Sequence, residues 1–319
     1  MSDCAKTVIP FAAIAAFFVS FEIPAKIGFF FGSTSIQTAM TYLYPAHPCY
    51  WPNLLAGIVF LATLPLASLR AENHDWQSAI ELAIHTHHYL YREYDELGGK
   101  LNQEKGRLPG LSLAWQLSDA QWQWLVGGQV MAHQVDYQGQ TNLGNWFVSL
   151  TDERMHSFYS AVYRTVSPAL KVGAAVKWFE WDRQIRPRGS ILGLNEVYNW
   201  QQLELGMTYQ LYAQGTWQCW FEGRVTRTIK PTVKVDLTRN RLGIVKLTMS
   251  GARGYAARLA TRYRVAPKLH LTARVEYQTW SFAASALTEA AGRTIPVRVQ
   301  EPESESALTS LSIGVAYLF

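Results

Sequence analysis

Residues 202–211 read QLELGMTYQL and alternate strictly between polar and apolar side chains. A period of two is the signature of a β-strand that has one face in water and the other in an apolar medium. The same alternation runs through 269–280, 111–117 and 122–130, and it extends over 244–265. In that last segment the predicted apolar face consists of Val245, Leu247, Met249, Tyr255, Leu259 and Tyr263. The chain from residue 72 onward is therefore predicted to be all-β.

Turn signals divide this region into ten strands. Short turns are indicated at 118–120, 167–168, 214–216 and 266–268, and long polar connections at 92–109, 136–144, 183–196, 231–242 and 283–304. Short and long connections alternate along the chain, as they do in membrane barrels with tight periplasmic turns and longer outer loops. The sequence predicts a ten-stranded antiparallel up-and-down transmembrane β-barrel.

Composition excludes several classes of protein. The chain has 319 residues, of which 49% are hydrophobic, 13% aromatic and only 17% charged, with a net charge of +5. So much apolar surface excludes disorder, and no basic cluster indicates a nucleic-acid partner. After residue 71 no apolar run approaches the roughly 20 residues of a spanning helix. The three cysteines, Cys4, Cys49 and Cys219, are too few and too far apart for a disulfide framework.

The first 71 residues are set apart from the predicted barrel. Residues 54–67, LLAGIVFLATLPLA, resemble the apolar core of a signal peptide, with cleavage expected after Ala71. Two interpretations remain open for residues 1–50: translation starts further downstream, or the segment forms a helical anchor. The predicted division is a signal-like extension over 1–71 and a barrel over 72–319.

The distribution of aromatic residues favours a membrane barrel over a soluble sandwich. Barrels place aromatic girdles at the two membrane interfaces. The girdle near the long loops is predicted to contain Tyr89, Tyr91, Trp178, Trp181, Tyr198, Trp200 and Trp280. The girdle near the short turns is predicted to contain Trp122, Trp124, Tyr212, Trp217, Trp220 and Tyr263. In a barrel the apolar face meets lipid and the polar face lines the interior.

The C-terminus carries a resemblance. The chain stops at Phe319, and five alternating residues share one face: Leu311, Ile313, Val315, Tyr317 and Phe319. This pattern resembles the closing strand of bacterial outer-membrane β-barrel proteins. The resemblance implies an outer-membrane location, contact with membrane lipid, and recognition of this strand by the barrel-assembly machinery.

Inward-facing charges are predicted to form a network in the lumen. Its members are Glu81, Lys171, Lys177, Glu204, Glu222, Arg224, Arg258, Arg262, Arg274 and Glu276. A ten-stranded barrel is little wider than an eight-stranded one, whose side chains fill it. We therefore expect a plugged, non-enzymatic barrel with surface loops for envelope or external interactions. The alternative is a narrow porin-like path for small anions past Lys171, Lys177, Arg258 and Arg262.

Catalytic and metal sites have weaker support. His85 and His87 share a face, and His133 or His270 would have to join them to hold a metal, so no metal or cofactor is expected. The adjacent His156 and Ser157 point to opposite faces of a strand and do not form a dyad. No match to the Asp–His arrangement of outer-membrane proteases is evident at Asp136 or Asp182. A protease or lipid-modifying enzyme remains a third interpretation.

Basic residues near the long loops are candidates for contact with lipopolysaccharide. Guanidinium groups match phosphate geometry in bidentate fashion. The predicted contacts are Arg183, Arg186, Arg188, Lys230, Lys234, Arg239 and Arg241.

Overall fold

The computed structural model describes residues 76–141, 144–251, 253–290 and 297–319. The predicted extension over 1–71 and the cleavage site therefore lie outside the described residues. The barrel strands are β1 (Gln77–Tyr94), β2 (Lys100–Ser118), β3 (Trp122–Gln140), β4 (Trp146–Ser167), β5 (Leu170–Ile185), β6 (Leu194–Gln214), β7 (Trp217–Asp236), β8 (Ile244–Thr248), β9 (Arg253–Ala266), β10 (Leu269–Phe282) and β13 (Glu303–Leu318). In the described part of the chain, no helix is long and apolar enough to cross a membrane.

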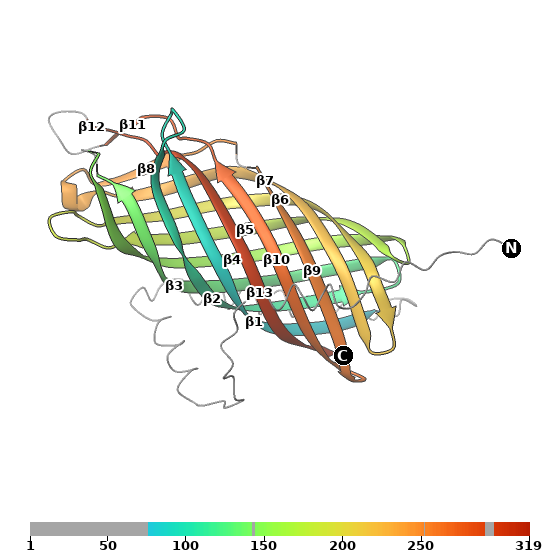
Figure 1. Cartoon of the computed structure of the whole chain (residues 1–319). Helices are drawn as coiled ribbons and strands as arrows, with labels where there is room; N and C mark the ends of the chain where they lie inside the picture. Colours follow the sequence, from blue (N-terminus) through green and yellow to red (C-terminus); the bar gives the residue numbers. More distant parts are fainter. Residues whose placement is uncertain (1–75, 142–143, 252, 291–296) are drawn as a thin grey trace, which may run out of the picture. The chain divides into compact units, whose positions relative to one another are not determined.

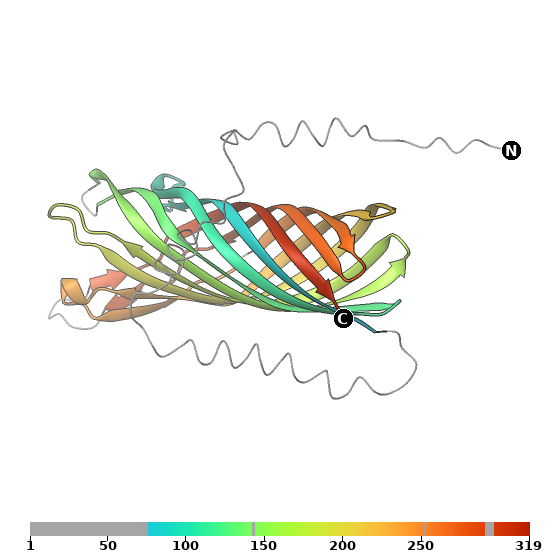
Figure 2. The same ribbon diagram turned by 90° about the horizontal axis from the view of Figure 1, so that it is seen from below.

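The strands form a closed antiparallel barrel with ten positions around its wall. Each strand pairs with its neighbour in sequence, and β13 pairs with β1 to close the ring. The segments β8 and β9 occupy one position, because both pair with β7. Figures 1 and 2 show the sheet rolled into a tube, with strands tilted to its axis. The predicted fold class and topology are confirmed.

The two ends of the barrel differ in their connections. At the end that holds Phe319, turns of two or three residues join β2 to β3, β4 to β5, β6 to β7 and β9 to β10. At the other end, the short helix η1 (Thr238–Asn240) and the strands β11 (Thr288–Ala290) and β12 (Val297–Val299) lie in the connections. We name these the periplasmic and extracellular ends, following the barrel architecture.

The predicted long connections are mostly strand. The connection expected over 92–109 shrinks to the turn between Tyr94 and Lys100, and β4 alone has 22 residues. A tilted strand needs only about 9–11 residues to cross a bilayer. The strands therefore extend well beyond the membrane on the extracellular side.

The lower half of the barrel, toward the periplasmic end, has its apolar face outward. Leu205 is 64% exposed, whereas its neighbour Glu204 is 5% exposed and lies inside. Leu271 and Ile313 are likewise exposed on the outer wall. This lipid-facing belt confirms the predicted orientation of 202–211, 269–277 and the C-terminal strand.

The polarity of the two faces reverses halfway up the strands. On β5, Trp178 lies on the outer wall and is 40% exposed. The odd-numbered residues Phe179 and Trp181 point inward and are buried, and Trp181 is 0% exposed. Above this level the outer positions are polar, among them Glu180 and Asp182. The extracellular half is thus built like a soluble sheet whose apolar side faces inward.

This reversal overturns two predictions. Most of the aromatic residues assigned to the upper girdle are buried in the interior: Tyr89, Tyr91, Trp181, Tyr198, Trp200 and Trp280. The lower girdle does hold four exposed residues, Trp122, Trp124, Tyr212 and Trp217, whereas Trp220 lines the lumen.

The apolar face predicted over 244–265 is also wrong in its upper part. Val245, Leu247 and Met249 are buried inside the barrel, whereas Tyr255 is exposed outside. The switch lies beside an irregularity in β7, where the pairing with β6 shifts by one residue. Lys230 has a φ of 45° there, a left-handed conformation that is unusual for a lysine. A bulge of this kind re-aims the side chains beyond it.

The belt makes a direct prediction about stability. Leu205→Arg should destabilise the barrel by about 2–4 kcal/mol, because the substitution puts a charge in the middle of the bilayer. Gln201→Arg, on the outer face of the same strand but above the belt, should cost about 0–1 kcal/mol. Urea unfolding in lipid vesicles measures both variants. Equal losses at the two positions would contradict the position assigned to the membrane.

Candidate functional site

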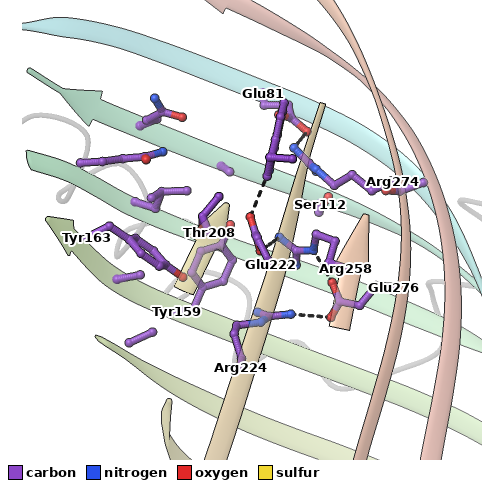
Figure 3. Close-up of a pocket in the computed structure, with 18 of the residues that line it drawn as sticks. Glu81, Ser112, Tyr159, Tyr163, Thr208, Glu222, Arg224, Arg258, Arg274 and Glu276 are labelled. Atoms are coloured by element: carbon purple, nitrogen blue, oxygen red, sulfur yellow. Dashed lines mark hydrogen bonds and ion pairs between the residues drawn. The ribbon is translucent and has the colours of Figure 1, made fainter. Parts of the chain in front are cut away.

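The periplasmic half of the interior contains a polar cavity of about 280 Å³. Its wall comprises side chains from nearly every strand, and Figure 3 labels several of them, including Arg224, Arg258 and Glu276. They point inward because they occupy the polar register of strands whose other register meets lipid. All ten residues of the predicted charge network line this cavity.

Four carboxylates and three arginines in the cavity form ion pairs. Arg224 contacts Glu276 at 2.7 Å and Glu204 at 3.4 Å. Arg258 contacts Glu276 at 2.5 Å and Glu222 at 3.0 Å. A separate pair joins Arg274 to Glu81. These contacts join the inner faces of five strands, β1, β6, β7, β9 and β10, in one polar layer.

Three predicted network cations stand outside these pairs. Among the described residues, none of the ion pairs includes Lys171, Lys177 or Arg262. Lys177 lies 4.4 Å from the centre of the Phe179 ring, and the Arg262 guanidinium lies 5.6 Å from that of Trp220. Lys171 donates to the Gln123 side-chain oxygen at 2.8 Å.

Two histidines and a serine form a chain of contacts near the top of this cavity. The His85 Nδ1 and His87 Nε2 atoms are 2.5 Å apart, and the other ring nitrogen of His87 contacts the Ser310 hydroxyl. His133 is exposed, and His270 lies near the periplasmic end of β10. In the described part of the chain, no group of three or more His, Cys, Asp or Glu side chains is arranged to hold a metal.

The extracellular half of the interior is filled by an aromatic core. Phe179 and Trp200 stack with ring centres 4.6 Å apart, and Trp181 and Tyr198 stack at the same distance. Leu108, Met131, Met155, Leu247 and Leu308 pack with these rings in the same buried cluster. The residues that the sequence placed in a lipid-facing girdle thus lie inside the barrel.

Arg183 lies within this core and not at the lipid surface. Its side chain is 1% exposed and contacts Glu196 at 2.5 Å, Glu104 at 2.9 Å and Glu93 at 3.0 Å. The prediction that Arg183 contacts lipopolysaccharide is therefore wrong. The sequence predicts a loop at this position, but the residue belongs to β5, where the odd-numbered residues point inward.

Two further buried carboxylates complete what we call the Arg183 cage, which also includes Glu93, Glu104 and Glu196. Glu153 accepts a hydrogen bond from the Trp181 indole, and Glu301 accepts one from the Tyr198 hydroxyl at 2.5 Å. None of these five glutamates is among the residues that the sequence pattern predicts for a site. The available signal was the occurrence of glutamate in the same register as buried aromatic residues, as in Tyr91 followed by Glu93.

Described parts of the last extracellular connection are buried against the interior. Glu301 and Ser285, in the connection that holds β11 and β12, are both buried, and the Glu301 amide donates to the Ser285 hydroxyl at 2.9 Å. Ala290, at the end of β11, belongs to the aromatic core. Burial, together with the charges of Glu196 and Glu93, raises the pKa of the Glu301 carboxyl well above its usual range.

The other predicted lipopolysaccharide contacts are exposed near the extracellular end: Arg186, Arg188, Lys230, Lys234, Arg239 and Arg241. Arg186 is paired with Asp152 at 2.7 Å. Two like-charged cross-strand pairs stand out on the outer wall: Lys234 lies opposite Lys246, and Arg227 lies opposite Arg253. We call these the basic rungs.

Two further predicted groups have clear positions. The five residues of the C-terminal pattern are exposed on the outer wall of β13 and at the chain end: Leu311, Ile313, Val315, Tyr317 and Phe319. His156 is half-buried on the outer face of β4, and Ser157 is buried inside. Their side chains point to opposite faces, as the alternation of a strand requires.

Comparison with known proteins supports the fold. No protein-family model matches the sequence, and no curated protein matches it either. Among solved structures, the outer membrane protease OmpT from Escherichia coli is similar, with a TM-score of 0.54 and 11% sequence identity over 78% of this chain and 99% of OmpT. The translocator domain of the autotransporter NalP from Neisseria meningitidis matches with a TM-score of 0.40 and 10% identity, covering 83% of this chain and 97% of that domain.

By fold, the chain is an outer-membrane β-barrel protein. A closed barrel with an apolar belt satisfies every requirement for a structure that crosses lipid by strands. The apolar belt places the barrel in a membrane, and the barrel carries a charged, buried interior. At this level of identity the likeness shows the fold alone.

The Arg183 cage makes a prediction about stability. Arg183→Met should destabilise the barrel by about 3–5 kcal/mol, because it leaves buried carboxylates without their cation. Arg186→Met removes an ion pair at the surface of the same strand end and should cost about 0.2–1 kcal/mol. Urea unfolding in vesicles measures both. A loss at Arg183 no larger than that at Arg186 would show that the cage does not depend on the guanidinium.

Proposed function

We propose that this barrel is a non-conducting, non-enzymatic envelope protein that anchors lipopolysaccharide and displays short extracellular connections. The aromatic core in its extracellular half carries the proposal. Stacked rings and aliphatic side chains fill the lumen there, and the one arginine among them is bound by three glutamates.

The main alternative is a narrow path for anions, and the interior argues against it. Lys171, Lys177, Arg258 and Arg262 line the periplasmic cavity. A solute that passed them would next meet the buried core around Trp200 and Phe282, which offers no water-filled route. Hydrated ions do not cross a dry apolar layer at useful rates.

Planar-bilayer recording tests this proposal. The wild-type chain should give no stable conductance steps. Trp200→Ala with Trp280→Ala should produce them, because these rings lie 6.3 Å apart across the core. Trp178→Ala, which removes a lipid-facing ring, is the control and should remain silent. Wild-type steps that disappear in Lys177→Ala would support the anion path instead.

The basic rungs support contact with lipopolysaccharide phosphates. Like charges directly opposite each other in a sheet are destabilising, so these pairs favour an anion that bridges them. The Arg227–Arg253 rung begins one outward position above the last apolar residues of the belt, Val225 and Tyr255. We propose that phosphate groups of the outer leaflet bind at this level. The exposed Lys230, Arg239 and Arg241 extend the same basic surface.

Binding of lipopolysaccharide in bicelles tests this contact. Arg227→Gln with Arg253→Gln should weaken binding about ten-fold or more, since a charged hydrogen bond contributes about 1.5–3 kcal/mol. Arg264→Gln with Lys268→Gln removes the same charge from the periplasmic end and should have no effect. Equal losses in the two double variants would indicate that net charge alone decides binding.

The C-terminal strand is proposed as the contact for the barrel-assembly machinery. Tyr317 and Phe319 support this role, because their rings lie 5.3 Å apart at the end of the outer wall and are exposed.

A further inference from the structure

The periplasmic cavity is a blind pocket. Its lining includes Pro168 and Ala169 in a periplasmic turn, and Ala79 and Gln218 near the ends of their strands. Toward the extracellular side it reaches His87 and Leu308, where the aromatic core begins. The pocket can therefore receive a ligand from the periplasm without any transport across the membrane.

The pocket carries more positive than negative charge. Six basic side chains line it, against four glutamates. Every glutamate is engaged by Arg224, Arg258 or Arg274. Three cations have no carboxylate partner, Lys171, Lys177 and Arg262, and the four glutamates exceed their three arginine partners by one, so the net surplus is two positive charges. An uncompensated charge in a confined site favours a bound counter-ion.

Two of these cations lie on the periplasmic side of the paired layer. Lys171 is the second residue of β5, directly after the turn at Pro168 and Ala169. Arg262 lies on β9 and pairs with Gln218 across the wall. The Arg262 Nε–H is buried and has no acceptor among the described residues. A buried donor without a partner is costly, so this geometry favours a ligand that supplies an acceptor.

The neighbouring groups suit an oxyanion. The amides of Gln116, Gln123, Gln210 and Gln218 also line the pocket, beside the Tyr163 ring. Amides donate hydrogen bonds to an anion without adding charge. A guanidinium binds two oxygens of a phosphate at once, and an ammonium adds a compact charge. The surplus of two charges matches a dianion.

We propose that this pocket binds a phosphate monoester or free phosphate from the periplasm, held between Lys171 and Arg262. This inference goes beyond the plugged-barrel function, because a pocket closed toward the outside binds without conducting. Lys177, deeper in the pocket and over the Phe179 ring, supplies long-range attraction.

Titration calorimetry of the full chain in detergent micelles tests the proposal with inorganic phosphate and glycerol phosphate as probes. The wild-type chain should bind both with one site. Lys171→Gln with Arg262→Gln should lower the affinity at least ten-fold, whereas Lys171→Arg should largely retain it. Arg264→Gln with Lys268→Gln, at the exposed periplasmic rim, is the charge-matched control and should bind as the wild type does.

Several outcomes would overturn the inference. These are no binding at millimolar phosphate, unchanged affinity in the Lys171 and Arg262 double variant, or an equal loss in the rim control. Succinate, a dicarboxylate of the same charge, should bind at least ten-fold more weakly, and equal binding would refute recognition of phosphate. Heat-dependent gel migration checks folding, and Arg262→Lys replaces Arg262→Gln if the latter does not fold. Conductance is measured in a separate experiment. The outcome of the phosphate test therefore does not decide whether the barrel is plugged.

Discussion

Lipid offers no hydrogen-bond partners to a peptide backbone, and the rest of this structure depends on that constraint. A β-sheet can satisfy it only by closing on itself, which β1 and β13 accomplish through an unbroken register from Ala79–Leu318 to Tyr94–Glu303. Closure around ten positions leaves a lumen that side chains can nearly fill. Alternation along each strand then sends apolar residues to the lipid and confines charged residues inside, where they pair.

The membrane accounts for only the lower part of the barrel. Above the belt, water surrounds the outer wall. Polar side chains are therefore favoured on the outer face there, and apolar side chains on the inner face. Polar residues such as Glu180 and Asp182 face outward, and aromatic residues such as Trp181 and Tyr198 face inward. One continuous sheet therefore combines a membrane barrel with the inside of a soluble protein. The aromatic core inside the extracellular half is a consequence of this reversal.

Charge is handled differently in the two halves. In the wet periplasmic cavity, arginines and glutamates alternate in a shared network, and cations are left over. In the dry extracellular core, the Arg183 guanidinium forms ion pairs with three glutamates. Two more carboxylates accept hydrogen bonds from Trp181 and Tyr198. Access to water explains why cations can be left over in the lower cavity, because an unpaired charge is tolerable beside solvent and costly in an apolar core.

The barrel, its strand count, its orientation in lipid and the inward position of the lower charges are predictable from the sequence. Each of these follows from local alternation and turn residues within the belt, where one medium lies outside. The arrangement of the upper half is not predictable in this way. The alternation continues there, but the apolar side chains face inward and the polar ones outward. For this reason the sequence predicts Arg183 in a loop and Trp200 in a lipid-facing girdle, whereas both are buried inside. Which face is buried depends on whether lipid or water lies outside a given level of the wall. The height of each residue along the barrel depends on how all ten strands pair with one another. The sequence of a single strand does not contain this information.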